Sequence, residues 1–239
     1  GLGSLHIKKR SSLDFGNSGT LARLLIGILS STPNIEVDVK GDKSLNKRNM
    51  SKLIDLMSEF GAQFYPKNRN NFPLKIISSA IPVGIRYNAG VSAQLKSAVM
   101  LAGLNSFGVT NIYEKYKSRD HTENILKINS KTIKKINGNI KIRGKGFINS
   151  MKTIVPGDPS TSAFVTTLTL LNTNSELLIK GVGLNKRRIG YYMLMKSCGA
   201  NIKFKNVKKR NNELLGDIKV KSSKLKPINA KSEFYVSST

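Results

Sequence analysis

The stretch Gly-Asn-Ser-Gly-Thr at residues 16–20 precedes an apolar segment, and the same arrangement occurs three times in the chain. The second copy is Gly-Val-Ser-Ala-Gln at residues 90–94, and the third is Gly-Asp-Pro-Ser-Thr at residues 157–161. Ser, Thr and Asp accept hydrogen bonds from the free N–H groups of a helix start, so each copy predicts a loop that opens a helix. Asn17 and Ser92 are 75 residues apart, and Ser92 and Ser160 are 68 residues apart. This near-constant period predicts a repeated supersecondary unit.

A second loop and a second helix complete each unit. Leu-Asn-Lys-Arg at residues 45–48 recurs at residues 184–187, and Arg119 occupies the equivalent loop of the middle unit. An apolar stripe with helical spacing follows residue 48 and ends at Gly61, where a left-handed C-cap is expected. Convergent turn chemistry is the alternative, because Gly, Ser, Asn and Asp favour turns in any fold.

The pattern as a whole predicts an α/β protein. Helices are expected over residues 21–29, 50–60, 95–104, 123–128 and 162–171, and a further helix is expected after Arg187, ended by Gly199 and Ala200. Strands are expected over residues 34–40, 74–77, 109–113, 139–143, 176–179, 202–204 and 217–221. Residues 131–136 fit neither type well.

Composition limits the class of protein. The chain has 239 residues, of which 39% are hydrophobic, enough for a packed core in one large or two small domains. No apolar run approaches the roughly 18 residues of a membrane span. The single cysteine, Cys198, excludes an internal disulfide and indicates a reducing compartment. With only two histidines, far apart in sequence, we expect no metal site.

The net charge of +26 has two interpretations. It can indicate an anionic partner, such as nucleic acid, a membrane or a phosphorylated small molecule. It can also reflect basic residues scattered over a solvated surface, because only residues 208–210 form a compact basic run. Aromatic residues are 7% of the chain and Trp is absent, which weakens the case for single-stranded nucleic acid.

The predicted helix starts favour anionic ligands, because free N–H groups at a helix N-terminus attract phosphate and carboxylate. Gly19 would let a ligand approach the backbone, and Thr20 can cap the helix. Arg23, one turn later, would face the same ligand or pair with an acid. In the second copy, Ser92 and Gln94 can bond hydroxyl groups or anionic oxygens.

Four further side chains could serve this chemistry. Arg48 and Arg119 have the planar guanidinium that binds phosphate at two points, although Arg119 could instead pair with a neighbouring carboxylate. His121 is either an acid–base group or a hydrogen-bonded residue at a helix start. Lys96 lies in a first helical turn, where the helix dipole disfavours a cation, so we expect it to be exposed unless an anion lies nearby.

Six motifs in order carry a family resemblance. They are Leu-Asp-Phe-Gly-Asn-Ser-Gly-Thr (13–20), Gly-Asp-Lys-Ser-Leu (41–45) with Arg48, Ser-Ala-Gln-Leu-Lys-Ser-Ala (92–98), Ser-Arg-Asp-His-Thr-Glu (118–123), Val-Pro-Gly-Asp-Pro-Ser (155–160) and Val-Gly-Leu-Asn (182–185). Together they resemble the 5-enolpyruvylshikimate-3-phosphate (EPSP) synthases, or 3-phosphoshikimate 1-carboxyvinyltransferases, of the bacterial class with Ser-Ala-Gln-x-Lys-Ser-Ala. The resemblance covers nearly the whole chain but only about the middle half of such an enzyme.

The resemblance implies the enolpyruvyl transferase fold, an α/β (α+β) architecture with pseudo-threefold βαβαββ repeats in two lobes. Residues 1–155 would form the N-terminal lobe without its opening unit. Residues 156–239 would form the start of the C-terminal lobe. The middle unit is shortened over residues 127–142, which suggests divergence there.

The resemblance also implies an activity of the shikimate pathway. The enolpyruvyl group of phosphoenolpyruvate would be transferred to the 5-hydroxyl of shikimate 3-phosphate, with release of phosphate and without a cofactor or metal. Phosphoenolpyruvate would be held by Asn17, Gly19, Thr20, Arg48 and Gln94, and shikimate 3-phosphate by Ser92, Ala93, Gln94 and Arg119. A bulkier residue at Gly19 disfavours the inhibitor glyphosate in this family, so the resemblance implies glyphosate sensitivity.

Departures from the family pattern set limits. The catalytic Asp and Glu of the family match no residue of this chain, and the early Lys-Ser-x-x-x-Arg segment is missing before residue 1. We therefore expect this chain alone to be inactive, to expose apolar surface and to be poorly soluble. We expect the full-length gene product to be a cytoplasmic monomer that binds neither nucleic acid nor membrane.

Three alternatives stay open. UDP-N-acetylglucosamine enolpyruvyl transferases share the fold and chemistry, but they have a cysteine-bearing active-site loop, whereas Cys198 lies at a predicted helix end and is interpreted as structural. A basic nucleic-acid-binding module is supported by the net charge alone, and its affinity would fall steeply with salt. The third alternative is a truncated product without a function.

Overall fold

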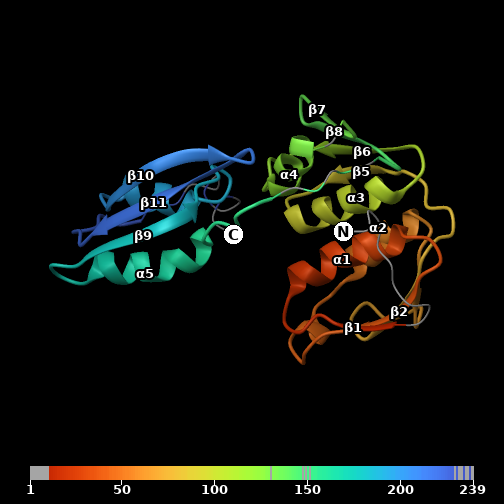
Figure 1. Cartoon of the computed structure of the whole chain (residues 1–239). Coiled ribbons are helices and arrows are strands. Elements are labelled where there is room, and N and C mark those ends of the chain that lie inside the picture. Colours follow the sequence, from red (N-terminus) through yellow and green to blue (C-terminus); the bar gives the residue numbers. More distant parts are fainter. Residues whose placement is uncertain are drawn as a thin grey trace. The chain divides into compact units, whose positions relative to one another are not determined.

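The computed structural model describes residues 11–129, 131–146 and 152–228, together with the single positions 148, 150, 230, 234 and 237. The chain divides into two compact units (Figure 1). The first consists of residues 1–116 and 129–150, and the second of residues 117–128 and 151–239. Residues 117–128, which the sequence analysis groups with the first lobe, thus belong by their contacts to the second unit.

Two sheets of the first unit have the same topology. The first has the order β1-β2-β4-β3 and the second the order β5-β6-β8-β7. In each, the first two strands are parallel and the other pairs are antiparallel. The strands are β1 (Ser11–Asp14), β2 (Glu36–Lys40), β3 (Gln63–Tyr65), β4 (Leu74–Ile77), β5 (Arg86–Ala89), β6 (Val109–Glu114), β7 (Ile133–Ile136) and β8 (Asn139–Arg143). The identical order and directions confirm the predicted repeat.

The first helix of each copy lies at the centre of this unit. Helices α1 (Gly19–Ser31) and α3 (Ala93–Asn105) lie side by side between the two sheets (Figure 1). A Cβ added at Gly27 would lie 2.5 Å from the carbonyl oxygen of Ala98, so the two helix backbones approach closely here. This packing brings the N-terminal ends of α1 and α3 into one region.

The second helix of the first copy is α2 (Ser51–Glu59), preceded by a 3-10 turn at Leu45–Lys47. The predicted apolar stripe is confirmed, because Leu53, Met57 and Phe60 are buried. Gly61 has φ of +94° and ends the helix, as the sequence predicts.

The second unit contains a third copy of the repeat. Its sheet has the order β10-β11-β9 and is antiparallel, like the last three strands of each sheet in the first unit. A parallel bridge between Gly157 and Val182 stands where the other copies have their first strand. The elements are α4 (His121–Asn129, assigned to this unit up to residue 128), α5 (Pro159–Leu171), β9 (Glu176–Gly183), α6 (Gly190–Ser197), β10 (Asn201–Arg210) and β11 (Glu213–Lys221).

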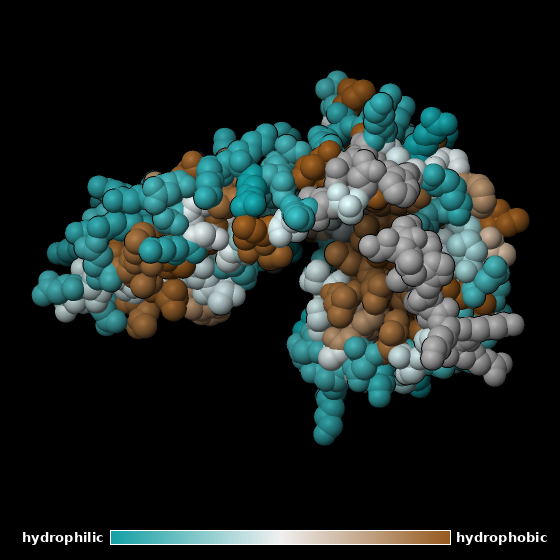
Figure 2. Space-filling model, in the orientation of Figure 1, coloured by the Kyte–Doolittle hydropathy of each residue, from teal (hydrophilic) through white to brown (hydrophobic). Residues whose placement is uncertain are grey.

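Each unit has its own apolar core, and the second also exposes an apolar face. Val182, Tyr192 and Ile218 are fully buried between the sheet and its helices. On α5, by contrast, Phe164 is 79% exposed and Leu171 is 69% exposed. Figure 2 shows apolar residues gathered over this helix.

None of the helices in the described part of the chain is long and apolar enough to cross a membrane.

Candidate functional site

The site of the first unit begins with the loop that opens α1. Ser18, and not Thr20 as the sequence suggests, caps this helix, because its Oγ accepts a hydrogen bond of 3.1 Å from the N–H of Leu21. Ser18 stands directly before the first helical residue, where a side-chain oxygen reaches the free N–H groups, whereas Thr20 lies inside the helix. The cap is neutral and the first turn holds no acid, so the positive end of the helix dipole is available to an external anion.

A second loop is fixed against the first. Asn17 Nδ2 donates a 2.6 Å hydrogen bond to Asp42 Oδ2, and the N–H of Asp42 donates to the carbonyl of Gly16 at 2.8 Å. Asp42 Oδ1 accepts from the N–H of Leu45, at the start of the turn that leads to Arg48. The hydrogen bonds from Asn17 and Leu45 lower the pKa of Asp42, which therefore stays ionised. These contacts hold the loop of Arg48 beside the start of α1.

Two guanidinium groups meet at Gly19. A Cβ at this position would lie 2.8 Å from Nη1 of Arg23 and 2.9 Å from Nη1 of Arg48. Arg23 also donates a 3.0 Å hydrogen bond to the carbonyl of Gly19. Burial, and then the charge of Arg48, lower the pKa of Arg23. Two like charges at a helix N-terminus repel each other, and a bound phosphate or carboxylate would relieve that repulsion.

The start of α3 repeats this local geometry. Ser92 caps the helix by accepting a 3.3 Å hydrogen bond from the N–H of Leu95, and Ala93 is the first helical residue. Gln94 Nε2 donates a 2.7 Å hydrogen bond to Oγ1 of Thr20. This hydrogen bond between residues 74 positions apart in the chain connects the starts of α1 and α3.

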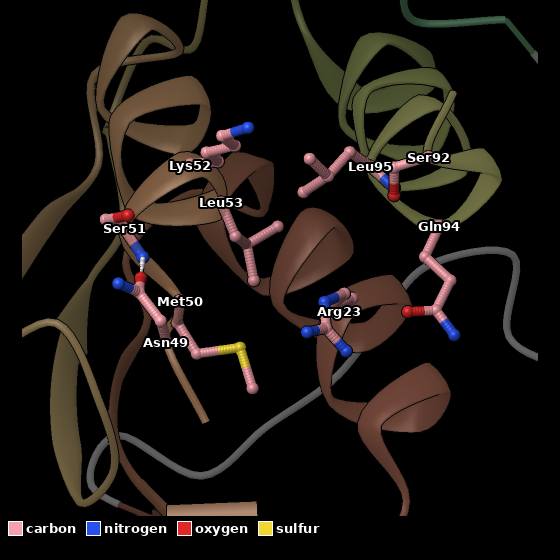
Figure 3. A pocket seen from close by; sticks show the side chains of 9 residues that line it. All are labelled: Arg23, Asn49, Met50, Ser51, Lys52, Leu53, Ser92, Gln94 and Leu95. Atoms are coloured by element: carbon pink, nitrogen blue, oxygen red, sulfur yellow. Dashed lines mark hydrogen bonds between the residues drawn. The ribbon is translucent and has the colours of Figure 1, made fainter. Parts of the chain in front are cut away.

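A cavity of about 350 Å³ lies at these helix starts (Figure 3). Arg23, on α1, lies between the α2 side and the α3 side. The described lining includes two cations and no acid, so the cavity is electropositive. It is lined by Arg23, Asn49, Met50, Ser51, Lys52, Leu53, Ser92, Gln94 and Leu95.

The sequence analysis missed Asn49 and Lys52 as parts of this cavity. Both follow Arg48 closely and stand at the N-terminal end of α2, where Asn49 Oδ1 accepts a 2.7 Å hydrogen bond from the N–H of Ser51. Their position beside a predicted binding arginine and a helix start is the signal that could have identified them.

Lys96 is buried, contrary to the expectation that it is exposed. Its side chain is 0% exposed, and its Nζ lies 2.7 Å from Oε1 of Glu114, whose Oε2 lies 2.8 Å from Nζ of Lys135. Burial raises the pKa of Glu114, but the hydrogen bonds and charges of Lys135 and Lys96 outweigh it and lower the value to about 2. The anion that the sequence analysis required near Lys96 is therefore a carboxylate of the protein itself.

Arg119 lies in the second unit, whereas all the other predicted site residues lie in the first. Burial, and then the nearby charge of Arg188, lower the pKa of Arg119, while Asp158 acts in the opposite direction. A neighbouring carboxylate was one expected partner of Arg119. Two of the neighbouring carboxylates have other partners, because Asp120 pairs with Arg187 and Glu114 pairs with two lysines.

His121 is a hydrogen-bonded residue at a helix start. It is the first residue of α4, and its Nδ1 lies 2.9 Å from Oε1 of Glu213. This contact agrees with the structural interpretation of His121. Among the described residues, no cluster of His, Cys, Asp and Glu could hold a metal ion, and Cys198 is buried at the end of α6.

Comparison with known proteins identifies the family. The family model described as EPSP synthase (3-phosphoshikimate 1-carboxyvinyltransferase) matches residues 1–234. The 3-phosphoshikimate 1-carboxyvinyltransferase of Zymomonas mobilis is 38% identical over 233 residues, which cover 95% of this chain and 51% of the relative. That of Petrotoga mobilis is 40% identical over 230 residues, covering 95% of this chain and 53% of the relative.

Solved structures agree with these sequence matches. EPSP synthase from Acinetobacter baumannii aligns with a TM-score of 0.80 and 32% identity, over 95% of this chain and 51% of that structure. The enolpyruvyl transferase NikO from Streptomyces tendae, at 14% identity and a TM-score of 0.64, shares the fold. The chain spans about half the length of the relatives it matches. Because the family model matches nearly the whole chain, the chain belongs to the EPSP synthase family.

Proposed function

We propose that this chain is part of an enzyme that transfers the enolpyruvyl group of phosphoenolpyruvate to the 5-hydroxyl of shikimate 3-phosphate and releases phosphate. The observation that carries the proposal is the pair of guanidinium groups of Arg23 and Arg48 that both approach Gly19. Both substrates carry phosphate, and phosphoenolpyruvate carries a carboxylate as well. Paired arginines at a neutral-capped helix start suit such a ligand.

Phosphoenolpyruvate would bind at the start of α1. Gly19 allows the two guanidinium groups to approach the helix start, because a side chain there would collide with them. Asn17 fixes the loop of Arg48 through Asp42, and Thr20 and Gln94 close the other side through their hydrogen bond. Charge that develops on the departing phosphate would be stabilised by donors that are already in position.

Shikimate 3-phosphate would bind at the start of α3. The backbone of Ser92 and Ala93 and the amide of Gln94 would meet its hydroxyl groups and phosphate, with Gln94 between the two substrates. Arg119 would contact the phosphate as well. The whole protein would act as a cytoplasmic monomer, with the change of lobe near residue 155.

Growth complementation tests the proposed activity. The full coding sequence that contains this chain is expressed in a bacterium that lacks EPSP synthase and therefore requires aromatic amino acids. We expect the full sequence to restore growth, the Arg48→Ala variant to fail, and the matched Lys47→Ala variant, which removes an exposed neighbouring charge, to succeed. The 239-residue chain alone should not restore growth, because the family's catalytic Asp and Glu have no counterpart in it.

The same experiment separates the alternatives. A UDP-N-acetylglucosamine enolpyruvyl transferase or a nucleic-acid-binding module would not remove the requirement for aromatic amino acids. Failure of the full coding sequence to restore growth, with the protein present in the cell, would therefore contradict the proposed function.

A further inference from the structure

Arg187 is the arginine of the repeated Leu-Asn-Lys-Arg motif that the proposed function leaves without a role. It occupies the position in the third copy that Arg48 occupies in the first. The two side chains have different surroundings, because Arg48 approaches Gly19 whereas Arg187 contacts residues 118–120. The motif is therefore repeated in the sequence, but its arginine makes different contacts in the two copies.

Arg187 contacts the residue before Arg119 and the residue after it. Its Nη1 donates a 2.7 Å hydrogen bond to the carbonyl of Ser118, and its Nε lies 3.3 Å from Oδ2 of Asp120. Asn185 Nδ2 donates to Oδ1 of the same carboxylate at 2.8 Å. Both oxygens of Asp120 are thus engaged, and Ser118 is 1% exposed. The backbone before and after Arg119 is fixed by one short segment between β9 and α6.

Glu213 extends this attachment into α4. Its Oε2 accepts from Asn185 Nδ2 at 3.0 Å, and its Oε1 lies 2.9 Å from His121 Nδ1 and 3.0 Å from Asn124 Nδ2. Residues 118–124 are therefore held by polar contacts with β11 and with the loop before α6. Such contacts restrict a segment more firmly than apolar packing alone, because each has a defined direction.

Arg119 needs this support because its surroundings disfavour a charged side chain. It is half-buried and lies near the like charge of Arg188, so a mobile side chain would turn away toward solvent. A guanidinium that is already oriented binds phosphate with less loss of conformational freedom.

We propose that Arg187, supported by Asn185, is a positioning residue that holds residues 118–120 so that Arg119 is presented to the phosphate of a phosphate monoester. The role of Arg119 rests on the proposed function. The role of Arg187 in fixing the segment rests on the contacts alone. Arginine is required because one planar fork reaches both the Ser118 carbonyl and the Asp120 carboxylate, whereas a lysine supplies charge at a single point.

Hydrogen exchange of the 239-residue chain tests the fixing of the segment. We compare Arg187→Met and Arg187→Lys with the matched control Lys186→Met, which removes an exposed charge at the neighbouring position. Amides of residues 118–122 should exchange about tenfold faster or more in both Arg187 variants and normally in the control. Unchanged exchange of α1 amides verifies that each variant is folded, and Arg187→Lys is the milder change if Arg187→Met unfolds. Unchanged exchange of residues 118–122 would overturn the proposal.

Binding measurements then test whether Arg187 acts through Arg119. Arg187→Met and Arg187→Lys should each lower the affinity for shikimate 3-phosphate about tenfold and leave the affinity for shikimate, which lacks the phosphate, unchanged. In an Arg119→Ala background, Arg187→Met should have no further effect. Additive losses, or full rescue by lysine, would overturn the proposal. If Arg119→Ala alone leaves shikimate 3-phosphate binding unchanged, the assigned role of Arg119 fails, while the exchange measurement still decides the role of Arg187.

Discussion

Arg23 and Arg48 meet at Gly19, whereas Lys96 and Lys135 meet at the carboxylate of Glu114. At the residue scale this difference separates the proposed site for an external anion from an internal ion cluster. The sequence could identify Gly19 and Arg48 as candidates, because Gly19 begins a helix after a turn motif and Arg48 stands in a loop that precedes a helix. It could not identify the burial of Lys96, because its partner lies 18 residues away on a strand.

Replacement of Gly19 by alanine tests the paired arginines. The added methyl group would lie within 3 Å of both guanidinium groups, whose flexible ends can move, so we expect normal stability but about tenfold weaker binding of phosphoenolpyruvate and glyphosate. Calorimetry in the presence of shikimate 3-phosphate measures this loss. Gly90→Ala is the matched control, because nothing lies within 4 Å of the added Cβ. Equal affinities in wild type and Gly19→Ala would show that Gly19 does not face the ligand.

Glu114 predicts a dependence of stability on pH. Its folded pKa of about 2 lies below its ordinary value of 4.5, so its contribution is complete above about pH 4.5 and is lost as the pH falls toward 2. Glu114→Gln leaves buried Lys96 without this carboxylate and should lower the free energy of unfolding by about 3–5 kcal/mol at pH 7. Urea unfolding at pH 7 and pH 3 measures both effects. A deficit of the variant that is as large at pH 3 as at pH 7 would refute this account.

At the element scale, the three helix starts differ in what they leave available. Ser18 and Ser92 are neutral caps, whereas Asp158 caps α5 with its own charge and also pairs with Arg188 at 2.8 Å. A charged cap already satisfies the helix dipole, so α5 offers less to an external anion than α1 and α3 do.

Elements with strong local signals were predictable from sequence. The expected helices, including the one that ends before Gly199, and the seven expected strands are present, with β9, β10 and β11 longer than expected. Strands β1, β3 and β5 were missed because they are short and have few apolar residues, whereas the equally short β4 is rich in Leu and Ile. Strand β7 was ambiguous because Lys134 and Lys135 interrupt its apolar pattern, and only Lys135 finds an internal partner, Glu114.

The packing of α1 on α3 gives a prediction about stability. Gly27→Ala would bring a Cβ to 2.5 Å from the Ala98 carbonyl oxygen, a rigid backbone group, so the helices would have to separate. We expect the free energy of unfolding to fall by about 1–3 kcal/mol, despite the higher helix propensity of alanine. Urea unfolding beside Gly90→Ala measures the difference. A Gly27→Ala variant as stable as this control would mean that the helices do not pack as described.

At the scale of the whole molecule, the chain contains three related copies, and the apolar face of α5 stays exposed. The sequence predicts the repeat, which is visible in the loops, and exposed apolar surface in general, but it does not predict that α5 carries this surface. It does not predict that residues 117–128 join the second unit, because the contacts of Asn185, Arg187 and Glu213 are long-range.

The exposed face of α5 gives a prediction about solubility. Phe164→Gln with Leu171→Gln removes two large apolar side chains that contribute little to the core. We expect weaker binding of an apolar fluorescent dye, a higher soluble concentration and a free energy of unfolding within about 0.5 kcal/mol of wild type. Dye fluorescence measures the binding of the dye, and static light scattering measures the soluble concentration. A large loss of stability would show that this face is covered in solution.

The central claim is that the neutral-capped helix starts of the first unit bind an anionic substrate. A calorimetric titration of the 239-residue chain with shikimate 3-phosphate at two salt concentrations, with and without phosphoenolpyruvate, tests it most directly. We predict saturable one-to-one binding that survives the higher salt and is weakened by Gln94→Ala but not by Gln63→Ala, a change of an exposed glutamine on β3. The absence of saturable binding, or binding that Gln94→Ala leaves unchanged, would contradict the claim.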